Sequence, residues 1–248
     1  IGRWLGHLLH VQYGTPAGSA GLGVDTTVYR QLADTVRRDQ VAVLYQPEKW
    51  RRLPQHSLEA LALLKRRRPG TEIVFYGSPA VPEVDFHFTH LGLVEDLEEL
   101  NGLYNSSRAG LCISLTNPSR VPFEMMAAGC VPLDVYRYNT LFDYDNGTGL
   151  LTYQSAASIT EGLGRLLDEP ELLAARRERC LVAGARRTLD WEVDAAVNIV
   201  ELSLSGTTLT ELTVPRRSYT DRPVMAPEDD RPKTRAWCAW QDRLADMV

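Results

Sequence analysis

One polar loop followed by a single carboxylate carries the strongest chemical signal in the sequence. Residues 114–130 read SLTNPSRVPFEMMAAGC, and Thr116, Ser119 and Arg120 precede a predicted helix. The first backbone N–H groups of a helix lack internal partners and carry the positive end of the helix dipole, so they readily bind a phosphate. Two hydroxyl groups and a guanidinium add further donors at the same place. The loop therefore predicts a phosphate-binding site.

Glu124 lies in the first turn of that predicted helix, and two interpretations compete for it. The carboxylate could only complement the helix dipole, which contributes about 0.3–1 kcal/mol. One turn beyond a phosphate-binding loop, it is also placed to accept two hydrogen bonds from vicinal hydroxyls, as an acidic residue does on the ribose in dinucleotide sites. The neighbouring loop favours the second interpretation, so we expect Glu124 to bind a ribose.

A second basic cluster follows the first predicted strand of the same domain. Lys49, Arg51 and Arg52 stand in the segment VLYQPEKWRRLPQHSLEAL, ahead of a helix that Ser57 could cap. Basic loops are usually only solvated, so this cluster alone indicates little. Together with the loop at 116–121, it predicts a diphosphate held between a helix N-terminus and guanidinium groups.

Strands and helices alternate along the part of the chain that carries these loops. This alternation predicts an α/β fold, a Rossmann-like doubly wound parallel sheet, in which loops at the carboxyl ends of the strands bind ligands. Apolar strands are expected at 41–45, 72–76, 86–91, 109–115, 131–135 and 149–151. Helical periodicity is present at 4–11, 58–65, 97–104, 122–128, 159–167, 171–183 and 191–204.

Composition excludes several classes of protein. The 248 residues are 44% apolar and 24% charged, with a formal charge of −5, which argues against a nucleic-acid binder that relies on whole-surface electrostatics. No apolar run approaches the ~18–20 residues of a membrane span. Four cysteines show no metal-binding spacing, so we expect no metal site and a reduced, cytoplasmic setting. The chain begins at Ile1, and we expect it to be part of a longer polypeptide.

The C-terminal region departs from this pattern. Residues 205–235 lose periodicity and are rich in proline and mixed charge, which predicts an extended tail without regular structure. Residues 237–248 could form a short amphipathic helix. Two interpretations remain open for this region: a tail docked on its own domain, or a segment that binds a partner.

The order of these segments resembles the C-terminal, nucleotide-sugar-binding half of GT-B glycosyltransferases. The most similar pattern is the rhamnosyltransferase-like branch of the large retaining family four. GRWLGHLLHVQYG resembles the last helix of the N-terminal domain, AGLGVDTTVYR the interdomain crossing, and VLYQPEKWRR the first donor-domain strand with its basic loop. EIVFYGSP, the long block that ends in PFEMMAAGCVPLDV, and EGLGRLLDEPELLAARRERC follow in the family's order. The resemblance implies a division into 1–24, the end of the acceptor-side domain; 25–204, the nucleotide-sugar-binding domain; and 205–248, the tail with a short helix.

The resemblance also assigns roles to residues. The glutamate of the PFEMMAAG block, Glu124 here, binds the donor ribose in the family. Many relatives carry a second glutamate where this chain has Thr116, and an arginine where it has Gln46. The implied catalytic residues are Arg51, Arg52 and Thr116. The implied donor-binding residues are Glu124, Asn117, Pro118, Ser119, Arg120, Val121, Lys49, Gln46, Gly77 and Leu93.

The implied activity is transfer of a sugar, with rhamnose as a candidate, from a nucleoside diphosphate to a cell-envelope glycan with retention of configuration. No cofactor or metal is expected beyond the donor, a dTDP, UDP or GDP sugar. Further partners would be a glycan or lipid-linked acceptor and an N-terminal domain or partner chain, with no nucleic acid and no transmembrane span. The expected location is cytoplasmic, including a peripheral position at the inner membrane face. The alternatives are a non-catalytic GT-B-like binding or scaffold module and a GT-B-fold nucleotide-sugar epimerase.

Overall fold

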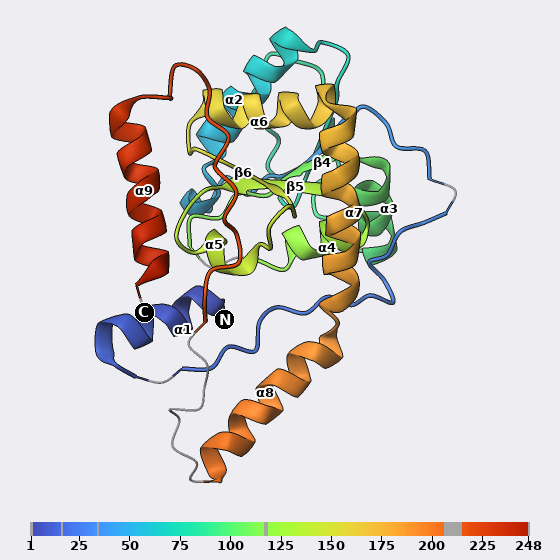
Figure 1. Ribbon diagram of the computed structural model, residues 1–248. Helices are drawn as coiled ribbons and strands as arrows, with labels where there is room; N and C mark the ends of the chain where they lie inside the picture. The colour runs from blue at the N-terminus through green and yellow to red at the C-terminus, as the bar shows by residue number, and fades with distance from the viewer. Residues whose placement is uncertain (1, 16, 34, 117–118, 206–214, 248) are drawn as a thin grey trace.

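The centre of the molecule is a six-stranded parallel sheet. The computed structural model describes residues 2–15, 17–33, 35–116, 119–205 and 215–247. The strand order is β3-β2-β1-β4-β5-β6 (Figure 1). The strands are β1 (Gln40–Leu44), β2 (Glu72–Tyr76), β3 (Thr89–His90), β4 (Ala109–Leu111), β5 (Val131–Val135) and β6 (Leu150–Thr152). The predicted Rossmann-like doubly wound sheet is thereby confirmed.

The strand order reverses between β1 and β4. From β1 the chain builds outward through β2 to β3, and it then returns to place β4 on the other side of β1. Val41 pairs with Ile73 of β2 and with Ala109 of β4, so β1 lies at the centre of the sheet. Ligands of open parallel sheets bind at such a reversal, beyond the carboxyl ends of the strands. The loops after β1 and β4 are therefore at the place where this fold holds a ligand.

Helices cover both faces of the sheet. Figure 1 shows α2 and α6 together on one face, while α4 lies toward the other and packs against α7. None of the described helices is long and apolar enough to cross a membrane. The helices are α1 (Arg3–Tyr13), the 3-10 turn η1 (Trp50–Arg52), α2 (Pro54–Arg67), α3 (Leu97–Ser106), α4 (Val121–Ala127), α5 (Thr140–Asp143), α6 (Ala156–Asp168), α7 (Pro170–Arg186), α8 (Leu189–Leu204) and α9 (Pro232–Asp246).

Small residues allow α4 to lie close to its neighbours. A Cβ atom at Gly110 of β4 would fall 2.3 Å from the sulfur of Met125, and a Cβ atom at Gly184 of α7 would fall 2.6 Å from the Cα atom of Ala127. Phe123 and Met125 are fully buried. Burying such side chains contributes about 1.5–3 kcal/mol each to the free energy of folding. α4 is therefore held firmly between β4 and α7.

Two predicted strands are shorter than expected. The segment 86–91 pairs only at Thr89–His90, and the segment 109–115 only at Ala109–Leu111. The N–H of Cys112 still donates to the carbonyl of Leu133 at 3.2 Å, and further on the backbone N–H of Leu115 donates to the Arg51 carbonyl at 2.9 Å, outside the ladder. The elements η1 and α5 were not predicted, because three or four residues are too few to show a helical period.

The C-terminal tail is docked on its own domain. Tyr219 is fully buried, and Val224 forms an isolated parallel bridge with Thr152 of β6. The N–H of Val224 donates to the carbonyl of Leu151, and the N–H of Tyr153 donates to the carbonyl of Val224, both at 2.9 Å. The tail therefore pairs with the edge of the sheet at β6. Residues 215–231 form no helix or strand apart from this bridge, as predicted, but they are packed against the domain and do not extend into solvent. The docked interpretation is confirmed for the described residues.

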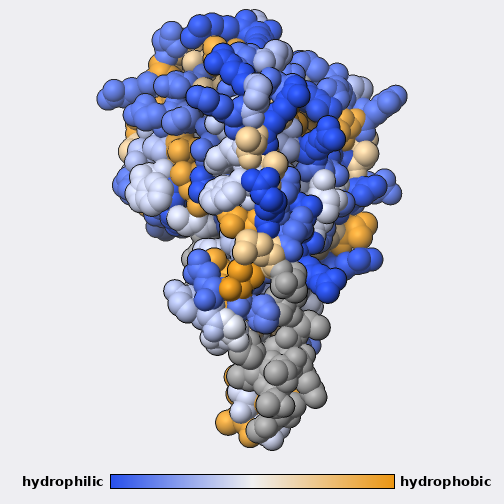
Figure 2. Space-filling view, turned by 60° about the vertical axis from the view of Figure 1, so that its left-hand side comes forward, coloured by the Kyte–Doolittle hydropathy of each residue, from blue (hydrophilic) through white to orange (hydrophobic). Residues whose placement is uncertain are grey.

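The last two helices also differ from expectation. α9 begins at Pro232, five residues before the predicted start, and Trp237 packs edge-on against Tyr153 at 5.5 Å between ring centroids. The first turn of α8 packs on the N-terminal segment, through Trp191 at Gly21 and through Glu192, which accepts the N–H of Gly23 at 2.7 Å. The rest of α8 projects away from the sheet (Figure 1), and Figure 2 shows hydrophobic side chains at the lower tip of this projection. The division at 24 and 204 stays a prediction.

Candidate functional site

The two loops singled out from the sequence meet at one edge of the sheet. We use the term carboxyl edge for the loops after β1, β2, β3 and β4 together with the start of α4. The hydrogen bond from Leu115 to the carbonyl of Arg51 joins the β4 loop directly to the basic loop. The Tyr45 N–H donates to the Tyr76 carbonyl at 2.8 Å and fixes the β1 loop beside β2. The predicted meeting of the Arg51 and Thr116 loops is thus a feature of the fold.

Glu124 has a half-buried carboxyl group on the first turn of α4. No described residue donates a hydrogen bond to this carboxyl group. Burial raises the pKa of Glu124 to about 7, and the positive charge of Arg120 only partly opposes this rise. A carboxyl group in this setting has room for two hydrogen-bond donors that the described protein does not supply, which is the arrangement a diol would satisfy.

Several buried polar atoms at the carboxyl edge also lack partners among the described residues. They are Ser119 Oγ, Gln46 Oε1 and Arg52 Nε. Buried polar atoms in native proteins nearly always have hydrogen-bond partners, and leaving one without any costs about 1–3 kcal/mol. All three residues belong to the loops of the carboxyl edge, and their atoms without partners indicate a surface that can bind a polar ligand.

The four predicted cations of this edge fall into two groups. Arg52 is only 6% exposed, and its Nη1 donates to the carbonyl of Ile113 at 3.1 Å. Arg120 forms an ion pair with Glu192 of α8. In contrast, the side chains of Lys49 and Arg51 form no hydrogen bond or ion pair with any described residue. Lys49 and Arg51 therefore carry the positive charge of this edge that is open to a ligand.

The remaining predicted residues are spread around the same edge. Gly77 follows β2 with a φ of 98°, a backbone conformation that favours glycine, and its carbonyl accepts a hydrogen bond from Gln46. Leu93 lies after β3 and is 61% exposed. Val121 is the first residue of α4, and Thr116 precedes it in the β4 loop. Asn117 and Pro118 lie outside the described residues.

Three side chains that hold the β4 loop were not identified from the sequence. Asn139 donates through Nδ2 to the carbonyl groups of Ser114 and Thr116, at 3.2 and 2.5 Å. The buried carboxyl group of Asp134 accepts the N–H of Ser114 at 2.9 Å, and burial raises its pKa to about 7. Glu192 is the third, through Arg120. The one available signal was Asp134 itself, an acidic residue inside the apolar strand VPLDV.

Comparison with known proteins agrees with this geometry. The sequence profile of the family described as WsaF, C-terminal domain, matches residues 39–162, which is half of the chain. This match spans β1 to the middle of α6 and so contains the whole carboxyl edge. No curated protein matches the chain.

Solved glycosyltransferase structures share the fold. The C-terminal domain of the glycosyl transferase group 1 family protein LpcC from Francisella tularensis is 16% identical, with a TM-score of 0.55, and covers 67% of this chain. A glycosyltransferase from Rickettsia africae ESF-5 is 12% identical, with a TM-score of 0.65 over 84% of this chain. The pneumococcal O-GlcNAc transferase GtfA is 14% identical, with a TM-score of 0.57 over 73%. The chain spans all of the Francisella domain but 63% of the Rickettsia protein and 38% of the pneumococcal one.

Proposed function

Because the chain belongs to the family of WsaF C-terminal domains, we propose that it binds the nucleotide-sugar donor of a glycosyltransferase at its carboxyl edge. The observation that carries this proposal is Glu124, a half-buried carboxyl group without a described donor, on the helix that follows the loop with the buried hydroxyl of Ser119. The pneumococcal relative was solved with UDP and GlcNAc, which makes a nucleoside diphosphate the first ligand to test.

Each part of the donor has a candidate partner at this edge. Glu124 accepts the two ribose hydroxyls, and the N-terminus of α4 with Ser119 receives the diphosphate. Lys49 and Arg51 approach the phosphates from the β1 loop, while Arg52 adds positive charge from inside the wall. Thr116 faces the transferred sugar. The other donor contacts in this proposal are Gln46, Gly77, Leu93, Asn117, Pro118, Arg120 and Val121.

The proposed reaction moves a hexose or deoxyhexose, with rhamnose as a candidate, to a hydroxyl of a cell-envelope glycan with retention. Backbone N–H groups and arginines meet the charge of the leaving diphosphate, so the proposal requires no metal. An acceptor-side domain, of which residues 1–24 are the proposed end, completes the site. The proposed location is cytoplasmic, at or near the inner membrane face.

Calorimetry with dTDP, UDP and GDP in the presence of EDTA tests this proposal. We expect one nucleotide to bind, and we expect its affinity to fall about ten- to a hundredfold in Glu124→Gln, because hydrogen bonds to a charged group contribute about 1.5–3 kcal/mol. Nucleotide binding that needs a divalent metal, or that ignores the Glu124 substitution, contradicts it.

A second candidate function is a non-catalytic binding module that keeps the fold. The bonds of Arg52 to Ile113 and of Arg120 to Glu192 favour this candidate, because they direct two of the four predicted cations toward protein groups. The same calorimetry separates the two functions: a folded protein that binds none of the three nucleotides is a scaffold.

A further inference from the structure

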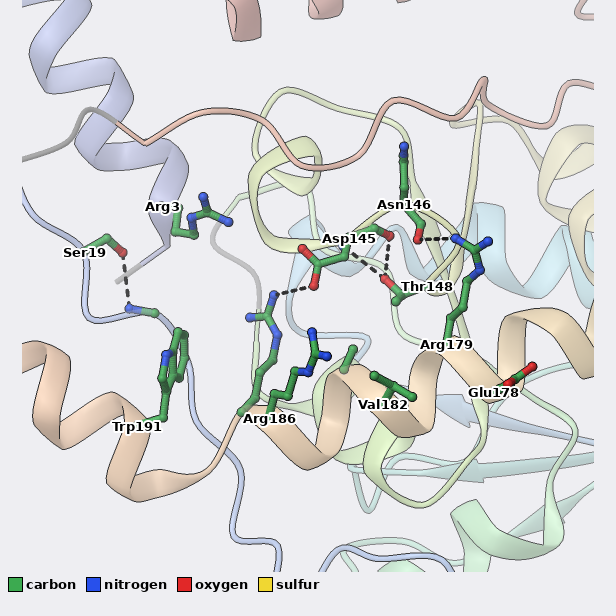
Figure 3. A pocket seen from close by; sticks show the side chains of 13 residues that line it. Arg3, Ser19, Asp145, Asn146, Thr148, Glu178, Arg179, Val182, Arg186 and Trp191 are labelled. Atoms are coloured by element: carbon green, nitrogen blue, oxygen red, sulfur yellow. Dashed lines mark hydrogen bonds and ion pairs between the residues drawn. The ribbon is translucent and has the colours of Figure 1, made fainter.

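A large cavity lies outside the carboxyl edge, against the second half of α7. Its volume is about 750 Å³, within the range of roughly 300–1,000 Å³ typical of small-molecule sites. The turn at 145–148 and the N-terminal segment form the opposite walls (Figure 3). We call it the α7 cavity. Its charged lining consists of Arg3, Arg179, Arg186, Arg187, Asp145 and Glu178.

Arg187 is the most informative residue of this lining. It is only 8% exposed, its guanidinium lies 4.3 Å from the ring centroid of Phe123, and Nη2 donates to the carbonyl of Asp143 at 2.6 Å. Nη1 is buried and has no hydrogen-bond partner within the described ranges. The carboxylate of Asp145 stays 3.8 Å from Nη2, which is a loose ion pair. A buried guanidinium with an unused donor needs an acceptor, and an anionic acceptor suits it best.

The charge of the α7 cavity points the same way. Four arginines face two carboxylates, so the lining carries two more positive than negative charges. Arg3 is engaged with the carbonyl groups of Phe142 and Arg216. Arg186 is exposed and makes no hydrogen bond or ion pair with any described residue. Within the described residues, Arg179 donates only to the carbonyl of Asn146, at 3.4 Å. Free donors therefore remain on Arg179, Arg186 and Arg187, and the last two are adjacent in the chain and line the same space.

The uncharged lining fits a sugar. Trp191 stands at one wall and Ser19 lies beside it, while Thr148 faces them from the turn (Figure 3). The hydroxyl of Ser19 accepts the N–H of Gly21, and that of Thr148 is bonded to the backbone of Asp145. The feature of this wall that suits a sugar is therefore the exposed ring of Trp191, on which an apolar ring face can pack. A phosphate alone would leave most of the volume empty. The fit to a saccharide rests partly on the proposed function, whereas the fit to an anion does not.

We propose that the α7 cavity binds a phosphorylated saccharide, with its phosphate on Arg186 and Arg187 and its ring against Trp191. Guanidinium groups hold phosphate oxygens through two parallel hydrogen bonds, and a dianion balances the two excess charges of the lining. The lining shares no residue with the carboxyl edge, and Phe123 of α4 contacts Arg187 from outside this lining.

Calorimetry with glucose 1-phosphate tests this proposal on the full chain. We expect binding to the wild type and a loss of at least about tenfold in affinity in Arg186→Ala, because the charged hydrogen bonds of that guanidinium to the phosphate are removed. Arg66→Ala, a substitution of an exposed arginine on α2, is the matched control and should leave the affinity unchanged. Trp191→Ala should lower the affinity for glucose 1-phosphate more than the affinity for inorganic pyrophosphate, because pyrophosphate has no ring that packs on the tryptophan.

Several outcomes would overturn the proposal. They are the absence of binding, an equal loss in Arg66→Ala, and a preference for glucuronate or uncharged glucose over glucose 1-phosphate. A loss caused by Glu124→Gln would place the ligand at the carboxyl edge instead. If glucose 1-phosphate binds while no nucleotide does, the cavity proposal stands and the proposed function falls, so the two are separately testable.

Discussion

Arg120 and Glu192 form a two-pronged ion pair, with Nη1 to Oε2 at 2.6 Å and Nη2 to Oε1 at 2.8 Å. The same carboxylate accepts the backbone N–H of Gly23 at 2.7 Å. One side chain on the first turn of α8 thus joins the loop before α4 to the segment that follows the N-terminal helix. The guanidinium of Arg120 thus holds three distant parts of the chain together, and its predicted contact with a phosphate stays a prediction.

Glu192→Gln should lower stability without weakening nucleotide binding. A paired arginine and carboxylate at a partly exposed site contribute about 1 kcal/mol, which shifts the thermal midpoint of a chain of this size by roughly 2–4 °C. Thermal unfolding measures this shift. Glu201→Gln, on the exposed part of the same helix, is the control and should have no effect. If Arg120→Ala costs as much stability in the Glu192→Gln variant as in the wild type, the two residues are not coupled.

Glu124→Gln should increase stability at alkaline pH while it weakens nucleotide binding. Burial raises the pKa of Glu124 from 4.5 to about 7, so the folded state holds the proton more tightly than the unfolded state. The stability that this proton contributes is complete below pH 4.5 and is lost as the pH rises through about 7. An amide is neutral throughout, so the variant should gain on the wild type at pH 8 and not at pH 4.5.

Urea unfolding at both pH values measures this difference. Glu99→Gln is the matched control, because Glu99 also lies in the first turn of a helix but is exposed. A Glu124→Gln protein that loses about 0.3–1 kcal/mol at pH 8 would mean that Glu124 serves the helix dipole.

Nucleotide affinity should depend on the protonation of Glu124. The charged carboxylate accepts two hydrogen bonds from a diol, whereas the protonated form accepts them more weakly. The ratio of wild-type to Glu124→Gln affinity should therefore rise between pH 6 and pH 8, with a midpoint near the raised pKa of about 7. Using the ratio cancels the titration of the nucleotide's own phosphate. A flat ratio across this range contradicts the ribose role.

The strands and helices of the sheet could be predicted because each depends on a pattern within its own stretch of sequence. The strands at 72–76 and 131–135 have the bounds that were expected, since apolar runs buried on both faces end where the hydrophobicity ends. The position of Glu124 followed from the helix start in the same way. The hydrogen-bond partners of Arg52 and Arg120 could not be predicted in this way. These partners are Ile113 and Glu192, which lie 61 and 72 residues away along the chain.

The tail was misjudged for a related reason. Residues 215–231 have the composition of a polar linker. Their few apolar side chains stabilise the fold only because other elements form the pockets in which they are buried. Composition averages over a segment, so it cannot show that a single tyrosine fills such a pocket. The α7 cavity was also out of reach of the sequence, because its walls come from three separate regions.

Tyr219→Ala should destabilise the protein strongly and leave nucleotide affinity unchanged. Tyr219 is fully buried in the tail, 6.3 Å from Tyr136 between ring centroids, and its hydroxyl accepts the N–H of Leu151 at 3.4 Å. Removing a buried aromatic side chain costs about 3–5 kcal/mol, so the thermal midpoint should fall by roughly 10 °C. Tyr13→Ala, at an exposed position of α1, is the control and should leave the midpoint nearly unchanged.

Calorimetry at a temperature below the lowered midpoint then measures the nucleotide affinity of the folded Tyr219→Ala variant. The tail contacts β6 at the sheet edge, three strands away from β1 in the sheet order, so an affinity loss in the folded variant would show that the tail forms part of the nucleotide site.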